Sequence, residues 1–440
     1  MAKDNKLGIW MAVALVVGNI IGSGIFLLPS SLAPLGFNSV WRWLVTSTGA
    51  VMLALVFTGL SRGLPDADGP YGYTQRAFGD LPAAVVLWGY WVGNWVGNAA
   101  IATAAVSYLS NLQPWIKDIH GASALVTVFF VGLFTAVNIH GVRAAGVVQL
   151  VSSILKLIPL VGIVGLGVFL VATGSPQLHN ADLLATPFRL GDVTAAATLT
   201  LWAMVGLESA AVLSKKVRDP ERNVGRATMI GTVLSAVVFI VASTTVMALI
   251  PAETLAHSNA PFADAASMFW GSAAAHWLAL FAAISALGAL NGWTLLNGEL
   301  TFLLAKNRII PAVFARESSR MTPTNAICLT SALSTIMVLM NFGKGMVEVF
   351  TFMILLSTTA ILVMYLMCAL AVLRLIFTGQ LAGSGGRVGL ALAGVLGAVY
   401  SLWALIGAGR EAVLWGFALL AVAVPVYYLM RRSHAAAPLP

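Results

Sequence analysis

Two glycine-containing segments interrupt otherwise apolar stretches of the chain. The first reads GNIIGSGIF at residues 18–26, and the second reads TLWAMVGLESAAV at residues 200–212. An unsatisfied peptide group costs several kcal/mol in lipid, so a membrane helix unwinds only where it lines a cavity or binds something polar. One broken membrane helix in each half of a chain is typical of secondary transporters whose site lies near the bilayer midplane.

The two segments predict complementary binding chemistry. Unwinding at Gly22, Ser23 and Gly24 frees backbone N–H groups, and the half-helix that follows presents its positive end, which suits a carboxylate. At the second break, carbonyl groups such as those of Trp202 and Val205 lose their helical partners and suit an ammonium group. Together the breaks predict a receptor for an α-amino acid. For any single glycine, the alternative is close helix packing in lipid.

Composition predicts an all-α membrane protein around these segments. Of 440 residues, 59% are hydrophobic and 9% are charged, whereas soluble chains carry roughly 25% charge. Apolar runs of about 20 residues predict twelve transmembrane helices in a single domain over 1–440. The start of the chain leads into the first run without a cleavage site, which predicts an uncleaved signal-anchor. The twelve runs lie at 7–32, 39–61, 83–111, 123–139, 148–172, 192–213, 226–249, 272–305, 324–341, 347–373, 388–407 and 411–430.

The net charge of +8 is explained by topology rather than by nucleic acid. If both termini are cytoplasmic, most of the 24 Lys and Arg residues lie on the inner side, as the positive-inside rule requires. The chain is therefore expected in a bacterial-type cytoplasmic (inner) membrane. Its expected partners are the lipid bilayer and a small amino acid or amine, with a homodimer left open and nucleic acid not expected.

Enzymatic motifs are absent from the sequence. It contains no HExxH, GxSxG or P-loop pattern, and its six histidines are scattered, so neither a metal, nor a cofactor, nor an enzyme is predicted. Polar residues concentrate at the two breaks instead of forming rings along a pore, which argues against a channel. Lys156, Glu208 and Glu299 are the ionisable residues within predicted spans, and such residues are functional candidates.

Several tracts of the sequence resemble one transporter superfamily. They are GNIIGSGIF, DGPYGYTQRAFGD (68–80), LWAMVGLESA followed by KVRDPERNVGRAT, APFADAASM (260–268) and LNGWTLL (290–296). These tracts resemble the amino acid-polyamine-organocation superfamily, and within it the basic amino acid/polyamine antiporters, especially the arginine/agmatine branch. The resemblance implies a leucine-transporter-type fold with 5+5 inverted repeats at about 7–172 and 192–374. Helices 1 and 6 would be broken, and the helices at about 388–430 would be peripheral.

The resemblance also implies a role for individual residues. Ser23 and Gly24 match the carboxylate-binding segment, and the carbonyls of Ile20, Trp202 and Val205 match those that hold the amino group. Trp293 matches an aromatic residue that covers the cationic side chain, because an indole face attracts a desolvated cation. The residues that match the guanidinium end are Asn98 and Ser357, with Gly93 and Asn94 alongside.

Gating residues are implied in the same way. Trp202 resembles an outer gate, and Tyr71 matches a tyrosine linked to pH-dependent gating. The residues that resemble the inner gate are Tyr90, Glu208 and Tyr365.

Four positions depart from the antiporter pattern. Asn94 replaces an expected cysteine and adds a donor and an acceptor, Pro70 interrupts a glycine pair, and Gly225 replaces a proline. Lys156 stands where the arginine/agmatine branch has a small residue, whereas proton-coupled and heteromeric relatives carry lysine. Its ammonium is predicted to replace a sodium ion by donating to carbonyls near Gly18 to Gly22, with Glu299 as a second partner. The alternative is a lysine that merely reaches cytoplasmic water.

The leading prediction is an antiporter that exchanges a basic amino acid, arginine, for its decarboxylated amine, agmatine or a related polyamine, by alternating access. The second is a proton-coupled permease for neutral or broad-range amino acids. A channel and a substrate-sensing receptor stay open as members of other classes.

Overall fold

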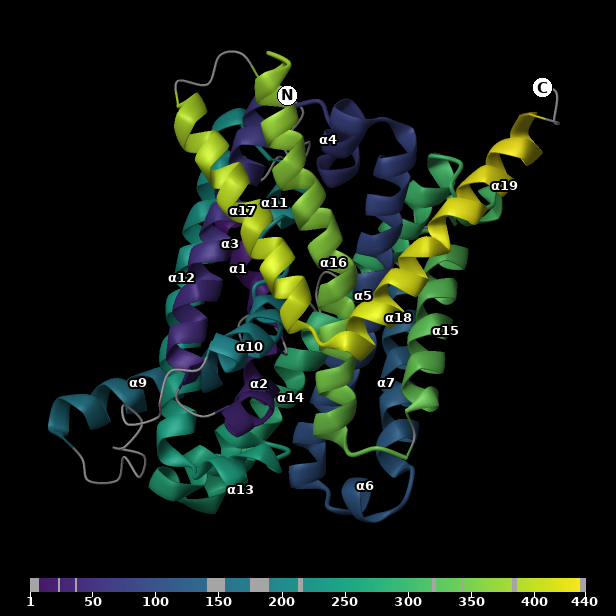
Figure 1. Ribbon diagram of the computed structural model, residues 1–440. Helices are drawn as coiled ribbons and strands as arrows, with labels where there is room; N and C mark the ends of the chain where they lie inside the picture. Colours follow the sequence, from purple (N-terminus) through teal and green to yellow (C-terminus); the bar gives the residue numbers. More distant parts are fainter. Residues whose placement is uncertain are drawn as a thin grey trace, which may run out of the picture.

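The structure is a computed structural model that describes residues 8–22, 24–35, 38–140, 155–174, 190–212, 217–318, 322–341, 343–381 and 386–435. Every regular element within these ranges is a helix, and most of the long helices run side by side as a bundle (Figure 1). In chain order the elements are α1 (Ile9–Ile20), α2 (Gly24–Leu32), η1 (Ala33–Leu35), α3 (Asn38–Gly63), α4 (Gly69–Phe78), α5 (Asp80–Leu112), α6 (Trp115–Asp118), α7 (Ala122–Ile139), α9 (Leu157–Thr173), α10 (Leu190–Ala203), α11 (Ser209–Val212), α12 (Pro220–Leu249), α13 (Ala252–Ala256), α14 (Pro261–Lys306), η4 (Ala312–Ala315), α15 (Thr324–Met340), α16 (Met346–Phe377), α17 (Arg387–Gly407), α18 (Arg410–Ala421) and α19 (Ala423–Ala435).

Many helices of the bundle have the length and apolar composition of membrane spans. Within the described ranges, 8 helical segments are long and apolar enough to cross a membrane, and α9 and α15 supply shorter apolar helices. Each of the predicted runs contains helix, including α5, which is not among the 8. The 33 residues of α5 span about 50 Å, enough to cross a bilayer. Its hydropathy is lowered by buried polar residues, among them Asn94 and Asn98.

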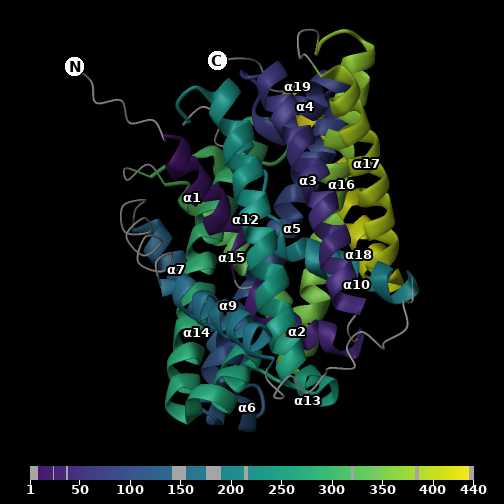
Figure 2. The same cartoon turned by 90° about the vertical axis from the view of Figure 1, so that its left-hand side faces the viewer.

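The bundle is organised around α5. This helix packs along α14 and α16, while α3 packs along α12 and α1 lies against α12. Figures 1 and 2 show α4, the start of α1 and the end of α19 at one end of the molecule, called the terminal end below. Helices α6 and α13 lie at the opposite end, called the far end.

The two predicted breaks are present and lie against each other. Helix α1 ends at Ile20 and α2 begins at Gly24, while α10 ends at Ala203 and α11 begins at Ser209. The Asn19 side chain donates from Nδ2 to the Ser209 hydroxyl at 2.8 Å, which joins the breaks directly. Gly206 has a φ of +111°, a conformation that favours glycine. A Cβ at Gly206 would lie 3.0 Å from the carbonyl carbon of Asn19, so a glycine also permits the close approach.

Two further interruptions occur in other helices. Gly271, at φ +77°, divides α14 into 261–270 and 272–306, and the predicted run at 272–305 begins just after it. The run predicted at 411–430 is divided between α18 and α19 at Val422. Pro425 explains this division, because proline has no N–H to donate to the carbonyl four residues earlier.

Replacing Gly206 with alanine is expected to destabilise the protein by about 1–3 kcal/mol, because the side chain adds strain at positive φ and crowds Asn19. Thermal unfolding in detergent should show a lower midpoint. Gly132→Ala is the control, since a Cβ there meets nothing within 4 Å. Equal midpoints for Gly206→Ala and the native protein would contradict the proposed constraint.

Candidate functional site

The backbone at the two breaks forms tight turns. The carbonyl of Ile20 accepts a hydrogen bond from the Gly22 N–H at 2.8 Å, and that of Trp202 accepts one from the Val205 N–H at 3.1 Å. The Trp202 carbonyl, predicted to lose its helical partner at the break, thus accepts from the residue three positions along in a short-range turn. A carbonyl oxygen has two lone pairs, so each of these groups still has one acceptor position for a ligand.

A small cavity lies at the meeting point of the breaks. Its volume is about 30 Å³, which admits one or two waters and not an amino acid. Most of the residues predicted to bind substrate line this cavity: Ile20, Gly24, Gly93, Asn94, Trp202, Val205, Trp293 and Ser357. Ser23 lies outside the described residues, and Asn98 lies beside the cavity, one helical turn beyond Asn94. A ligand of the size of an amino acid would therefore fit only if side chains of the lining moved.

Gly22, part of the predicted first break, also lines the cavity, and sequence reasoning missed five further lining residues: Asn19, Gly97, Ile101, Ala203 and Ile361. For three of them, the sequence spacing could have predicted a place in the lining. Gly97 and Ile101 follow Gly93 at intervals of four residues on α5, and Ile361 follows Ser357 by four on α16, so they share a face with predicted residues.

The polar side chains at the cavity are partly satisfied by the protein itself. The Ser357 hydroxyl donates to the Gly93 carbonyl at 2.6 Å, and the Asn94 amide donates to the Tyr90 carbonyl at 2.7 Å. The Asn98 amide donates to the Thr294 hydroxyl at 3.5 Å. The Asn98 Oδ1 is buried and accepts no hydrogen bond within the described part of the chain. Because a buried orphan acceptor is costly, this oxygen suits the N–H of a ligand or water.

Two indole rings supply the aromatic groups of the cavity lining. Trp202 packs edge-on against Phe350, with ring centroids 5.5 Å apart and planes at 89°. It also covers the start of α2, where a Cβ at Gly24 would lie 2.7 Å from its ring. Trp293, from α14, is the second indole of the lining and is 8% exposed. The site thus has aromatic faces and amide or carbonyl acceptors, which together suit a cation.

Glu208 lies between three segments on the terminal side of the second break. Its carboxylate accepts hydrogen bonds from the hydroxyls of Tyr90 at 2.9 Å and Tyr365 at 2.8 Å, and from the Gly206 N–H at 3.1 Å. The side chain is fully buried. The residues predicted as an inner gate are therefore brought together, and each donor is a neutral group.

Lys156 immediately precedes α9 and is 3% exposed. Its Nζ donates to the Gly18 carbonyl at 2.6 Å, which is the contact predicted with the first break. Glu299, the predicted second partner, lies at an exposed position of α14, and its contact with Lys156 stays a prediction. Packing of α9 against α12 and α14 orients the lysine inward, where its charge has a polar partner.

Tyr71 lies on α4 and connects two spaces. It lines an apolar pocket with Tyr90, Leu300 and Leu303, and it also lines a cavity of about 390 Å³ at the terminal end. Burial, and then the negative charge of Asp80, raise the pKa of Tyr71 above its ordinary value of 10.0. The phenol therefore stays protonated near neutral pH, so a pH-linked role of Tyr71 would act through its contacts.

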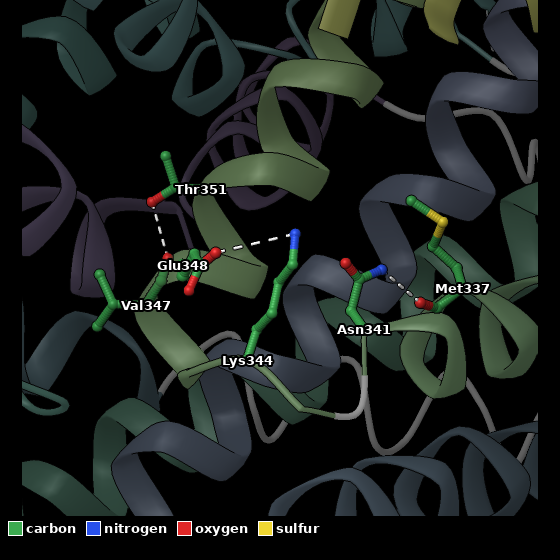
Figure 3. A network of polar contacts seen from close by, with 6 residues as sticks. All are labelled: Met337, Asn341, Lys344, Val347, Glu348 and Thr351. Carbon is green, nitrogen blue, oxygen red and sulfur yellow. Dashed lines mark hydrogen bonds and ion pairs between the residues drawn. The ribbon is translucent and has the colours of Figure 1, made fainter. Parts of the chain in front are cut away.

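The far end of the cavity is closed by hydrogen-bonded side chains. Tyr108, on α5, donates to the Phe26 carbonyl at 2.6 Å and accepts from the Phe262 N–H at 3.3 Å. Figure 3 shows a more exposed network at the start of α16, where Lys344 reaches Glu348 at 3.8 Å. The Lys344 ammonium also lies 5.4 Å from the ring centre of Phe352. The far end is thus tied by α2, α5 and the first part of α14.

Known proteins that are similar to this chain are named as transporters. The family model described as amino acid permease matches residues 7–429. A Bacillus subtilis (strain 168) protein that carries the provisional name arginine/ornithine antiporter is 31% identical over 97% of each chain. The cadaverine/lysine antiporter of Escherichia coli (strain K12) is 34% identical over 78% of each chain. The putrescine transporter PotE of Haemophilus influenzae (strain ATCC 51907 / DSM 11121 / KW20 / Rd) is 30% identical over 94% of each.

The match covers nearly the whole chain, and it includes both helix breaks and the cavity between them. The apolar helices of the bundle agree with a multi-pass membrane protein. The chain therefore belongs to the amino acid permease family of the amino acid-polyamine-organocation superfamily, and it is a membrane transporter rather than an enzyme.

Proposed function

We propose that the protein is an antiporter that exchanges a basic amino acid, arginine, for its decarboxylated amine, agmatine or a related polyamine. The observation that carries this proposal is the cavity between the two helix breaks. The Trp293 indole lines it, and beside it lies the Asn98 Oδ1, which accepts no hydrogen bond from the described residues. The names of the relatives, which refer to arginine, ornithine, lysine, cadaverine and putrescine, support a cationic substrate and exchange.

The substrate would be held by both breaks. The N–H groups at the start of α2 would bind the carboxylate, including those of Ser23 and Gly24, and the carbonyls of Ile20, Trp202 and Val205 would bind the α-amino group. An amine product lacks the carboxylate but keeps the cation. Trp293, Asn98, Asn94, Gly93 and Ser357 would surround the end that both substrates share, so one site serves both directions of exchange.

Alternating access would follow from the closures on the two sides of the cavity. We assign the outer gate to Trp202 and the inner gate to Tyr90, Glu208 and Tyr365. Tyr71 lies on the terminal side of the inner gate. The assignment includes twelve spans, with inverted repeats at 7–172 and 192–374 and peripheral helices at 388–430. Both termini would lie in the cytoplasm, since the basic loops gather at the terminal end. The breaks between α1 and α2 and between α10 and α11 would each fall in the first helix of a proposed repeat, which supports this arrangement.

A second candidate function is supported by Lys156. A buried ammonium bonded to the Gly18 carbonyl beside the first break can take the place of a coupling cation, as in a proton-coupled permease for neutral or broad-range amino acids. Under both candidates, transport would not require sodium.

Counterflow in proteoliposomes separates these functions. We expect uptake of labelled arginine to require internal arginine or agmatine and to continue without a proton gradient or sodium. Uptake driven by a proton gradient into empty vesicles, lost in Lys156→Ala, would favour the permease instead. Uptake that needs neither condition would indicate a channel.

Trp293→Leu should weaken basic substrates selectively. A desolvated cation over an indole gains about 2 kcal/mol, so arginine and agmatine affinities should fall about 30-fold while those of alanine and leucine change little. A competition panel against labelled substrate measures this. Trp277→Leu is the matched control, because Trp277 is 62% exposed on the bundle surface. Equal losses for cationic and neutral competitors would contradict a cationic substrate.

Glu208→Gln should flatten the pH dependence of exchange while substrate binding persists. Glutamine keeps an acceptor oxygen for the neighbouring hydroxyls but has no proton to exchange. Exchange rates from pH 4 to 8 and equilibrium binding at one pH should be compared with those of the native protein. A pH profile that the substitution leaves unchanged would exclude Glu208 as the coupling group.

A further inference from the structure

The cavity of about 390 Å³ at the terminal end has a polar lining that the transport site does not use. We call it the terminal vestibule, and it is lined by Tyr71, Gln75, Asp80, Asn307, Arg308, Tyr427 and Arg431. These residues come from α4, the first residue of α5, the chain after α14, and α19. Its volume is in the range of small-molecule sites.

One side chain in the vestibule is itself a guanidinium. Arg431 Nη2 lies 3.7 Å from Asp80 Oδ2, and the Arg431 guanidinium carbon lies 5.3 Å from the ring centre of Tyr427. Gln75 fixes the acceptor by donating from Nε2 to Asp80 Oδ1 at 3.0 Å. A carboxylate beside an aromatic face is the pair of groups that recognises a guanidinium or an ammonium. In the structure this pair holds a residue of the C-terminal helix.

The vestibule adjoins the inner gate. Tyr71 lines the vestibule and also the apolar pocket that contains Tyr90. Tyr90 in turn bonds to Glu208 and lies next along α5 from the cavity residues Gly93 and Asn94. A molecule released past Tyr90 toward the terminal end would therefore meet Tyr71 and then the vestibule.

We propose that the terminal vestibule is a second binding site for the cationic group of a basic amino acid or amine, and that Arg431 occupies it as a tethered competitor. The proposal rests on the proposed transport of basic substrates. A substrate at the terminal end displaces Arg431 from Asp80 and Tyr427 before it passes Tyr71. When no substrate is present, the guanidinium of Arg431 returns.

The energetics allow such exchange. The side chains of Asp80 and Arg431 are 53% and 63% exposed, so water and solutes reach both. Exposed ion pairs contribute little to stability, and a dissolved cation can replace one partner without leaving a buried charge. Arg308 and Asn307 supply donors in the same cavity, which suit the carboxylate of an amino acid. An amine lacks this carboxylate and would meet Arg308 as a like charge, so the amino acid should bind more tightly than its amine.

The test is the KM for substrate on each face, measured in inside-out and right-side-out vesicles. Arg431→Gln should lower the KM at the terminal face by about two- to fivefold, the range for loss of an exposed competing pair, and leave the other face unchanged. Asp80→Asn should raise the KM at the terminal face. In the Asp80→Asn background, Arg431→Gln should have no further effect, because the contested carboxylate is gone.

Two control variants accompany the test. Arg432→Gln removes the adjacent basic residue, which lines no part of the vestibule, and Lys344→Gln breaks the ion pair at the far end. Both should leave the KM at the terminal face unchanged. Raising the ionic strength should reduce the effect of Arg431→Gln, since exposed charge pairs are screened.

The outcomes separate this proposal from the proposed function. If no basic substrate is transported, the proposed function fails. If basic substrates are transported but Arg431→Gln leaves the KM at the terminal face unchanged, or lowers it equally in the Asp80→Asn background, the vestibule proposal alone fails. Equal changes on both faces would indicate a structural role of α19 and would also overturn it.

Discussion

The arrangement of the proposed transport site depends on the hydrogen bonds of one buried carboxylate. Glu208 accepts from Tyr90 of α5, Tyr365 of α16 and the backbone of Gly206 in the second break. A carboxylate without partners would be very costly at this depth in a membrane, so these segments are held together wherever the charge is present. The turn that offers the Gly206 N–H is the one in which glycine allows Asn19 to approach. The geometry of both breaks therefore follows from this cluster.

Helix α5 contributes to closure at both ends of the site. Tyr90 belongs to the Glu208 cluster, and Tyr108 bonds to α2 and to the first part of α14 at the far end. Along one continuous helix these two residues are about 27 Å apart. Both closures therefore include hydrogen bonds from α5, and opening either one requires these bonds to exchange.

Much of the site could be predicted from the sequence, because glycine clusters and ionisable residues are rarely placed in a membrane helix without a structural or functional reason. Glycine clusters within apolar runs located both breaks, and an ionisable residue in a span identified Glu208. The contact of Lys156 with the Gly18 carbonyl was also predicted, and it is present at 2.6 Å. These features have local causes, since lipid supplies no alternative partner for a charge or a free peptide group.

Other features depend on tertiary packing and could not be read in this way. The sequence does not show that the chain at Trp202 forms a tight turn, nor that Glu299 faces outward. Asn98 lies beside the cavity rather than in its lining, because the exact face of α5 depends on its contacts with α14 and α16. The division of the last run at Val422 could have been predicted from Pro425, but the run was predicted as one helix because its residues are continuously apolar.

The small volume of the cavity has a consequence for affinity. A space of about 30 Å³ cannot hold an amino acid, so binding draws on a less populated, more open arrangement. If the open form makes up a fraction f of the molecules, the apparent dissociation constant equals the intrinsic one divided by f. This factor is the same for every ligand that needs the same opening. The closed cavity therefore weakens all substrates alike and leaves their ratios to the residues that contact them, so selectivity and overall affinity can evolve separately.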